Sequence, residues 1–251
     1  MKERHTLVKQ HNEHTTQSDA KRQERAQRIL DAAAELVRRW GYGKTTIDDI
    51  ARQAGVAKGT IYLHWKTRED LFRALMIREE QTLANDIKQR IANDPQGTTL
   101  HSMLKHMLLA MLKNPLMKAA FLGDTLMLGE MARTRHGSRR SIERLTSFND
   151  YFEALRSQGL IRTDIGLKEG AYVISAIAIG FLLVNPLLPD EAKIPDEEAV
   201  ELMAETIRRT FEPDKPAPPE ALQAASHALD QYLDHTLEGM REASRQEMER
   251  E

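Results

Sequence analysis

Residues 45–71, TTIDDIARQAGVAKGTIYLHWKTREDL, restrict the possible fold more than any other stretch of this chain. Thr46 with Asp49 three residues later has the spacing of a capping box, which predicts that a helix begins there. Gly55 is expected to end this helix, because a tight turn between two helices needs a backbone conformation that a residue without Cβ adopts at low cost. A second short helix is then expected over residues 58–65.

The second short helix has two chemically distinct faces. Ile61 and Trp65 are spaced so that they can anchor the helix inward. Its other side chains form a polar, basic surface, namely Lys58, Thr60, Tyr62, His64 and Lys66. A helix-turn-helix needs this division, because its second helix packs through one face and presents hydrogen-bond donors to the major groove through the other. The stretch therefore predicts a DNA-binding unit.

The same stretch resembles the signature of the TetR family of transcriptional repressors. Family members usually have a Gly-Val turn, a Gly-Thr-x-Tyr recognition helix, an aromatic residue, a Lys, and Glu-Asp-Leu in the next helix. The matching residues here are Gly55, Val56, Gly59, Thr60, Tyr62, Lys66, Glu69, Asp70 and Leu71. Trp65 departs from the pattern, since Phe is commoner at that position. The resemblance is specific over residues 25–75, generic from there to 211, and absent in the two tails.

The resemblance implies an all-α protein in which a three-helix helix-turn-helix domain is joined to a helical ligand-binding and dimerisation domain. It also implies which residues contact double-stranded DNA. Residues 58–60 are expected at base edges and backbone, the following ones chiefly at phosphates, and those before the first helix at the preceding phosphate. The expected DNA-binding residues are Lys44, Thr45, Thr46, Lys58, Gly59, Thr60, Tyr62, His64 and Lys66. A structural role beside Trp65 is the alternative for His64.

Charge is distributed unevenly along the chain. The 251 residues contain 36 basic and 38 acidic side chains, for a net charge of −2. Residues 21–66 contain ten basic and five acidic side chains, so this segment has a net charge of +5 and the remainder −7. A basic lobe on an acidic body favours phosphate binding at one end only. The absence of Cys excludes disulfides and, with no apolar segment at the start, favours a cytoplasmic location.

Four segments are expected along the chain. Residues 1–20 lack an apolar period and predict a disordered tail, for which an arm in the minor groove is the alternative. Residues 21–80 form the DNA-binding domain, and 81–211 the effector-binding and dimerisation domain; both share a helix that continues to about residue 92. Residues 212–251 contain a Pro-rich linker and an extra helix over 220–249, expected to pack on the body or on a partner. The tail histidines His5, His11 and His14 have no acidic or Cys partners at ligand spacing, so neither a metal nor a cofactor is expected.

Helices over 98–113, 116–132 and 141–158 have apolar faces, and those of the first two are rich in Met. Such residues are usually core, but adaptable Met also suits the wall of an effector cavity. We therefore expect a lipophilic small molecule, with polar anchoring from Asp124, Glu130, Asn149 or Tyr151. The expected effector-binding residues are Met103, Met107, Met111, Phe121, Met127, Phe148 and Phe152.

The run AYVISAIAIGFLLV over 171–184 is almost entirely apolar. Its 14 residues are fewer than the ~20 that span a bilayer, so no membrane partner is expected. A helix that is apolar on all sides must be covered on all sides, which favours a homodimer. With the amphipathic helix over 196–211 it resembles the helix pair through which TetR-like proteins dimerise. The expected interface residues are Ile174, Ile177, Ala178, Phe181, Met203 and Ile207.

An enzyme is disfavoured, because the chain contains no nucleophile elbow, His-Glu-x-x-His motif, P-loop or dinucleotide-binding fingerprint. The sequence instead predicts a repressor that binds a palindromic operator as a dimer and is released by its effector. The alternative is a DNA-binding dimer without a small-molecule effector, controlled by a protein partner. A cavity that holds a ligand would distinguish the two.

Overall fold

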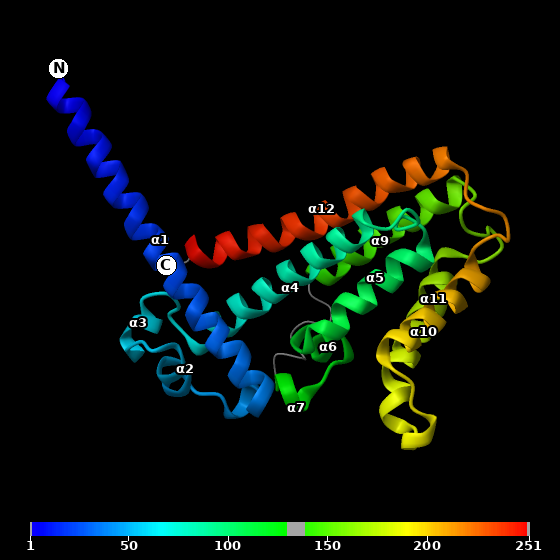
Figure 1. Ribbon diagram of the computed structural model, residues 1–251, viewed down its shortest axis with the longest axis horizontal. Helices are drawn as coiled ribbons and strands as arrows, with labels where there is room; N and C mark the ends of the chain where they lie inside the picture. The colour runs from blue at the N-terminus through cyan, green and yellow to red at the C-terminus, as the bar shows by residue number, and fades with distance from the viewer. Residues whose placement is uncertain (1, 130–138, 250–251) are drawn as a thin grey trace.

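The computed structural model describes the backbone of residues 2–129 and 139–249, and every regular element in these ranges is a helix (Figure 1). The expected all-α class is thus confirmed. The elements of the first half are α1 (Lys2–Trp40), the 3-10 turn η1 (Tyr42–Lys44), α2 (Ile47–Ala54), α3 (Lys58–Tyr62), α4 (Arg68–Ala92), α5 (Leu100–Lys113), α6 (Pro115–Leu122) and α7 (Thr125–Leu128). Those of the second half are α9 (Arg139–Ser157), α10 (Leu167–Val184), the 3-10 turns η2 (Asn185–Leu187) and η3 (Asp190–Ala192), α11 (Asp196–Phe211) and α12 (Pro219–Glu249).

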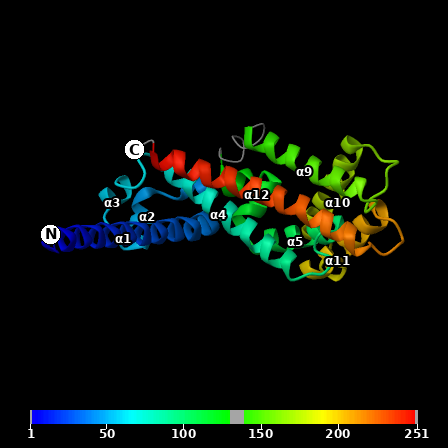
Figure 2. The same cartoon turned by 90° about the horizontal axis from the view of Figure 1, so that it is seen from above.

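Helix α1 is much longer than expected. It begins at Lys2, within the residues 1–20 for which the sequence predicts a disordered tail. No Gly or Pro precedes Gly41, so nothing interrupts a helix once its apolar second half has nucleated it, and extension adds one hydrogen bond for each residue fixed. Its N-terminal half projects away from the rest of the molecule in both views (Figures 1 and 2).

The N-terminal lobe consists of the second half of α1 with η1, α2, α3 and the start of α4. One apolar core holds it together, and its fully buried side chains include Ile29, Ile50, Ile61, Leu71 and Phe72. Side chains from later in the chain complete this core, namely Leu116, Met117 and Ala119 of α6 and Leu128 of α7. Helices α6 and α7 therefore pack against the N-terminal lobe although they come from the expected second domain.

The body is built on the second half of α4. Helix α5 packs beside α4, and α9, α10, α11 and α12 complete a second apolar core. Helix α12 lies against α4 and α9 in both views (Figures 1 and 2), and buries Ala225, Leu229 and Leu233 there. An ion pair of 2.9 Å between Lys88 and Asp234 adds to this contact. Helix α12 thus packs on the body of its own protomer.

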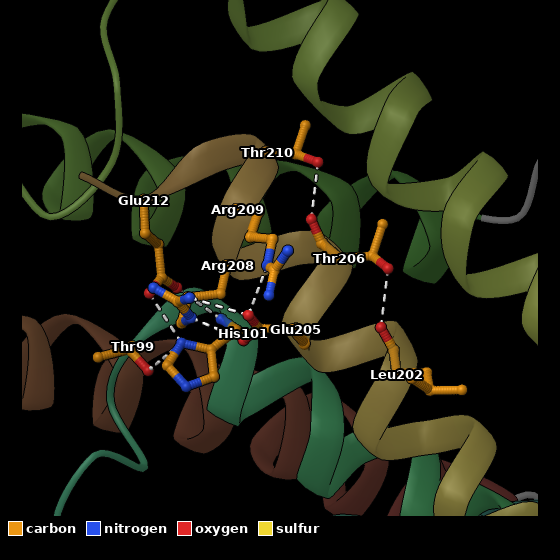
Figure 3. A network of polar contacts seen from close by, with 9 residues as sticks. All are labelled: Thr99, His101, Leu202, Glu205, Thr206, Arg208, Arg209, Thr210 and Glu212. Atoms are coloured by element: carbon orange, nitrogen blue, oxygen red, sulfur yellow. Dashed lines mark hydrogen bonds and ion pairs between the residues drawn. The ribbon is translucent and has the colours of Figure 1, made fainter. Parts of the chain in front are cut away.

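Helices α5 and α11 are joined by a polar contact at one end (Figure 3). The Nδ1 atom of His101 lies 2.7 Å from a carboxylate oxygen of Glu212, and the backbone N–H of His101 donates to the other oxygen at 2.8 Å. One turn earlier, hydrogen bonds from Arg208 and Arg209 lower the pKa of Glu205 from 4.5 to about 2. The His101–Glu212 contacts hold the C-terminal end of α11 against the first turn of α5, whereas the Glu205 contacts lie within α11.

The helix expected over 116–132 is interrupted. Gly123, with a φ of 66°, ends α6, and the Asp124 carboxylate accepts hydrogen bonds from the backbone N–H groups of Leu126 and Met127 at 2.9 and 3.0 Å. Asp124 therefore starts α7 in a new direction. Helix α7 lies against η1, where a Cβ on Gly41 would come within 2.9 Å of the carbonyl oxygen of Leu126. The loop expected from residue 133 lies largely outside the described residues.

Helix α10 is 18 residues long with a mean hydropathy of 1.7. In the part of the chain that the structure describes, it is the one helix long and apolar enough to cross a membrane by length and composition alone. The expected 14-residue length is therefore corrected, and length does not exclude a membrane span. Such a helix is weak evidence for one, since core helices of soluble proteins have the same composition.

Candidate nucleic-acid interface

The N-terminus of α2 has the predicted capping box. The backbone N–H of Asp49 donates to the Thr46 hydroxyl at 3.2 Å, and the Asp49 carboxylate accepts from the hydroxyl and backbone N–H of Thr46. The hydrogen bond from the Thr46 side chain lowers the pKa of Asp49 below its ordinary value. Gly55 ends the helix in the left-handed conformation, with a φ of 65°. Both ends of α2 are therefore fixed as the sequence predicts, with Thr46 exposed on the surface.

Helix α3 presents the expected polar face. Ile61 is completely buried in the core of the N-terminal lobe, whereas Lys58 and Gly59 are exposed and Tyr62 is 45% exposed. The helix ends at Tyr62, earlier than expected, so the half-buried His64 and the exposed Lys66 lie in the connection to α4. The His64 ring lies 5.4 Å from the Trp65 ring. Thr60 is half-buried, between the two faces.

Lys58 has an acidic neighbour. Its Nζ lies 2.9 Å from a carboxylate oxygen of Asp48 on α2, and this hydrogen bond raises the pKa of Lys58. Both side chains are at least half exposed, so the pair is screened by water and contributes little to stability. A phosphate approaching Lys58 would compete with Asp48.

Thr45 does not belong to this surface. Its side chain is 1% exposed, and its hydroxyl donates to the carbonyl oxygen of Gly41 at 2.9 Å. The expectation that the Thr45 side chain contacts DNA is therefore wrong, because this hydroxyl satisfies a carbonyl at the end of α1. Lys44 and Thr46 on either side of it are exposed.

Arg68 is a positioning residue that the sequence did not indicate. Its guanidinium donates to the carbonyl oxygens of Tyr42 and Thr45, the latter at 3.2 Å from Nε. The guanidinium carbon also lies 3.9 Å from the centre of the Tyr42 ring, a cation–π arrangement. Arg68 thereby holds the turn before α2 against the start of α4. The carbonyls that it binds have no signature in the sequence, which shows only an Arg after the Thr67 cap.

Most of the expected effector-binding residues belong to the body core. Met103, Met111 and Phe152 are buried in the body core, and Met107 and Phe148 pack partly buried against it. Two of the expected residues lie outside the body core. Phe121 is 40% exposed, and Met127 packs against the core of the N-terminal lobe, because the break at Gly123 turns α7 away from the body.

The expected polar anchors also have structural roles. Asp124 caps α7, and burial raises the pKa of Tyr151, whose hydroxyl donates to the carbonyl oxygen of Thr98 at 2.9 Å. Glu130 lies outside the described residues. No group of three or more His, Asp or Glu side chains in the described part of the chain could hold a metal ion.

Two cavities have none of the expected effector-binding residues in their walls. One, of about 300 Å³, lies between α5, α6 and the hairpin formed by α10 and α11. The other, of about 660 Å³, lies where α1 and α2 meet α4 and α6, and is lined by many charged side chains. Across the second cavity, Arg78 of α4 pairs with Asp31 of α1 at 2.6 Å and with Glu79 at 2.7 Å.

The expected dimer interface is partly corrected. Met203 and Ile207 of α11 are completely buried inside the protomer, and Ile174 and Ala178 of α10 are 5–6% exposed. They pack within the protomer, so they have almost no surface left for a partner. Ile177 and Phe181 are half-buried. The outward apolar strip instead consists of Tyr172, Ala176, Ile179, Leu183 and Val184 of α10 with Leu202 of α11.

Known proteins resemble this chain most in its N-terminal lobe. Residues 29–75 match the family described as "Bacterial regulatory proteins, tetR family". The chain is 42% identical over 66 residues to the fatty acid metabolism regulator protein of Bacillus subtilis, a match that covers 25% of this chain and 34% of that protein. The chain therefore spans about a third of the length of this curated relative.

Two longer matches extend into the body. The HTH-type transcriptional regulator YvkB of Bacillus subtilis is 26% identical over 180 residues, which cover 69% of this chain and 90% of YvkB. Among solved structures, NalD, the secondary repressor of the MexAB-OprM multidrug efflux pump in Pseudomonas aeruginosa, covers 77% of this chain and 98% of its own at 20% identity, with a TM-score of 0.52. At this identity the structural likeness is one of fold.

Proposed function

Because this chain belongs to the tetR family of bacterial regulatory proteins, we propose that it is a transcriptional repressor that binds a palindromic operator as a homodimer and is released by a small-molecule effector. Residues 21–80 would serve as the DNA-binding domain and residues 81–211 as the effector-binding and dimerisation domain. The proposal fits relatives that are transcriptional regulators, which form a non-enzymatic family.

The observation that carries the proposal is the outward face of α3. Lys58, Gly59 and Tyr62 are exposed there while Ile61 anchors the helix in the core. Gly59 lets the backbone approach the bases closely, and Lys58 and Thr60 place donors beside it. Tyr62, His64 and Lys66 follow at the end of the helix, where they would contact phosphates.

The N-terminus of α2 would hold a neighbouring phosphate. Thr46 is exposed there, and the first N–H groups of a helix favour anions. Lys44 lies just before it in the chain and adds a positive charge. Arg68 would act indirectly, by holding this turn in place through the carbonyl oxygens of Tyr42 and Thr45.

The outward apolar strip of α10 and α11 would form the dimer interface. Ile179, Leu183 and Leu202 are each at least a third exposed in the protomer, and apolar side chains clustered on one face mark an interaction surface. Pairing two protomers through a two-fold axis would present two α3 helices to successive major grooves, ~34 Å apart.

The experiment selects DNA from a random pool with the purified protein and measures binding of the selected sequence by gel shift. We expect an inverted repeat. The double variant Tyr62→Ala/Lys66→Ala should bind this DNA at least about a hundredfold more weakly, because it loses two phosphate contacts in each protomer of the dimer. Circular dichroism and size-exclusion chromatography should show that the variant remains a folded dimer.

A matched control removes positive charge elsewhere. Lys168→Ala/Lys215→Ala replaces two exposed lysines of the body and should leave operator binding within about twofold. Unchanged retardation by the Tyr62→Ala/Lys66→Ala variant would contradict the assignment of the interface. Selected DNA without two-fold symmetry would contradict binding as a dimer.

A further inference from the structure

The groove of about 300 Å³ between α5, α6 and the α10–α11 hairpin has mainly apolar walls. They are formed by Leu108 and Leu112 of α5, Phe181 and Leu182 of α10, and Ala199 and Val200 of α11. Its polar lining consists of Lys118, Asn185, Lys193 and Asp196. A small, mostly apolar cavity with a few polar groups is the usual form of a ligand site.

The charged side chains that line this groove are two lysines and one aspartate. Lys193 already pairs with Asp190 at 2.6 Å, and the Asp196 carboxylate accepts a hydrogen bond from the Asn185 side chain at 3.4 Å. Lys118 is half-buried beside the apolar walls and has no hydrogen-bond or ion-pair partner for its side chain among the residues that the structure describes. A partly desolvated ammonium gains more from an anion than a fully hydrated one does. The groove is therefore suited to a negatively charged group next to an apolar chain.

The side chains that line the groove are not those of the outward apolar strip. Leu182, Ala199 and Val200 are less than a tenth exposed and line the groove. Ile179, Leu183 and Leu202 do not line it and are each more than a third exposed. Pairing of two protomers through the outward strip would leave the groove available to a ligand.

Lys118 also lies one helical turn from a chain of contacts to the N-terminal lobe. Its backbone N–H donates to the carbonyl oxygen of Asn114, whose side chain donates to the Glu79 carboxylate at 2.9 Å. Glu79 pairs with Arg78, and Arg78 pairs with Asp31 of α1. A displacement of α6 would therefore act on contacts between α4 and α1, beside the DNA-binding surface.

We propose that this groove binds an amphipathic monoanion, with its carboxylate or equivalent headgroup on Lys118 and its apolar chain against Leu108, Phe181 and Val200. The anion is the effector, an assignment that rests on the proposed repressor function. Binding moves α6 and, through Asn114 and Arg78, favours a conformation with lower operator affinity. The size of this effect is limited by the difference in affinity of the ligand for the two conformations.

The test compares three probes with the same eight-carbon chain and different headgroups. Octanoate, octan-1-ol and octyltrimethylammonium are titrated into the full-length protein by isothermal titration calorimetry. Octanoate should bind once per protomer and at least about tenfold more tightly than the alcohol, the factor that one charge-assisted hydrogen bond supplies. The cation should bind more weakly than the alcohol. Equal affinities for the three probes would overturn the proposal.

Variants of Lys118 test the role of its charge. Lys118→Met keeps an unbranched side chain but removes the positive charge. It should weaken octanoate binding at least about tenfold while leaving binding of the alcohol unchanged. Lys118→Arg keeps the charge and should retain octanoate binding. Lys113→Met, which replaces an exposed lysine outside the groove, is the matched control and should bind like the wild type. Unchanged octanoate binding by Lys118→Met would overturn the site.

Regulation is tested separately on DNA. Octanoate should lower the affinity of the wild type for the selected operator and leave that of Lys118→Met unchanged. Octanoate binding through Lys118 without an effect on DNA would overturn the effector role and leave the ligand site standing. A protein that binds octanoate but selects no DNA would instead contradict the proposed repressor function.

Discussion

The outward face of α3 and the outward faces of α10 and α11 are both directed away from the cores, but their chemistry is opposite. Helix α3 presents Lys58 and Tyr62, whereas α10 and α11 present Ile179, Leu183 and Leu202. A basic polar surface is already well hydrated and gains from a polyanion. An apolar surface gains most from another apolar surface. The two regions therefore suit different partners, and in the proposed function these are DNA for the first and a second copy of the chain for the second.

The largest expected effect comes from a variant that places charge in the outward apolar strip. The double variant Ile179→Glu/Leu202→Glu would force four carboxylates into the interface of a dimer. Each costs several kcal/mol when desolvated, so we expect the dimer dissociation constant to rise by at least about a hundredfold. Sedimentation velocity measures this change directly. Operator affinity should fall by a comparable factor, because each protomer then binds a half-site alone.

The control for this variant replaces an exposed leucine elsewhere. Leu126 on α7 is 92% exposed and lies outside the outward strip, so Leu126→Glu should remain dimeric. If Ile179→Glu/Leu202→Glu also remained dimeric, the strip would not be the interface. The outward apolar strip and the outward face of α3 would then no longer be two binding surfaces of opposite chemistry.

The same contrast explains which surface the sequence could predict. In the segment around α3, polar and apolar residues are separated, so burial of Ile61 implies exposure of Lys58 and Tyr62. In α10 both sides are apolar, and its composition does not say which side packs inward. The expected interface residues Ile174 and Ala178 are consequently on the buried side, while Ile179 and Leu183 are exposed.

Other differences also arise from interactions that a local pattern does not contain. The resemblance predicts that Thr45 contacts a phosphate, but its hydroxyl donates to the carbonyl oxygen of Gly41, the residue after α1. Lys118 belongs to no sequence motif, and its proposed role in ligand binding depends on Phe181 and Val200, which line the same groove. Capping boxes, in contrast, involve residues only three positions apart, and the box predicted at Thr46 is present.

A second prediction compares the inward and outward sides of α11. Met203 is completely buried, and its neighbour Leu202 is 49% exposed. Met203→Ala should lower the free energy of unfolding by about 2–5 kcal/mol, because it leaves a cavity in the body core. Leu202→Ala should change it by less than about 1 kcal/mol. Urea denaturation measures both, in an Ile179→Glu background so that dimer dissociation does not contribute.

The order of the two changes is the informative result. A larger loss from Leu202→Ala than from Met203→Ala would mean that the inward and outward sides of α11 have been exchanged. The outward strip would then have to be redefined around Met203 and Ile207. Equal slopes of the unfolding free energy against urea are needed for the comparison, since a changed slope indicates altered compactness.

The smallest expected effect concerns the charged end of the same helix, one turn beyond Leu202. Arg208 and Arg209 donate to the Glu205 carboxylate at 2.7 and 2.6 Å and lower its pKa from 4.5 to about 2 (Figure 3). A lowered pKa in the folded state stabilises the fold above the pKa of the unfolded chain, and this contribution is lost as pH falls through the folded pKa. The stability difference between the wild type and Glu205→Gln should therefore be constant above about pH 5 and shrink between about pH 4.5 and 2.

The difference should be small, because the carboxylate is 40% exposed and water screens the pair. Glu197→Gln, at an exposed position on the first turn of α11, is the control and should show no such pH dependence. Comparing Glu205→Gln in the wild type and in the Ile179→Glu/Leu202→Glu background extends the test to the interface. The same pH dependence in both would mean that the interface formed by the outward apolar strip ends before Glu205. A stronger pH dependence in the dimer would instead mean that the interface desolvates the ion pair of Glu205. Helix α11 would then contribute charge as well as apolar surface to subunit pairing.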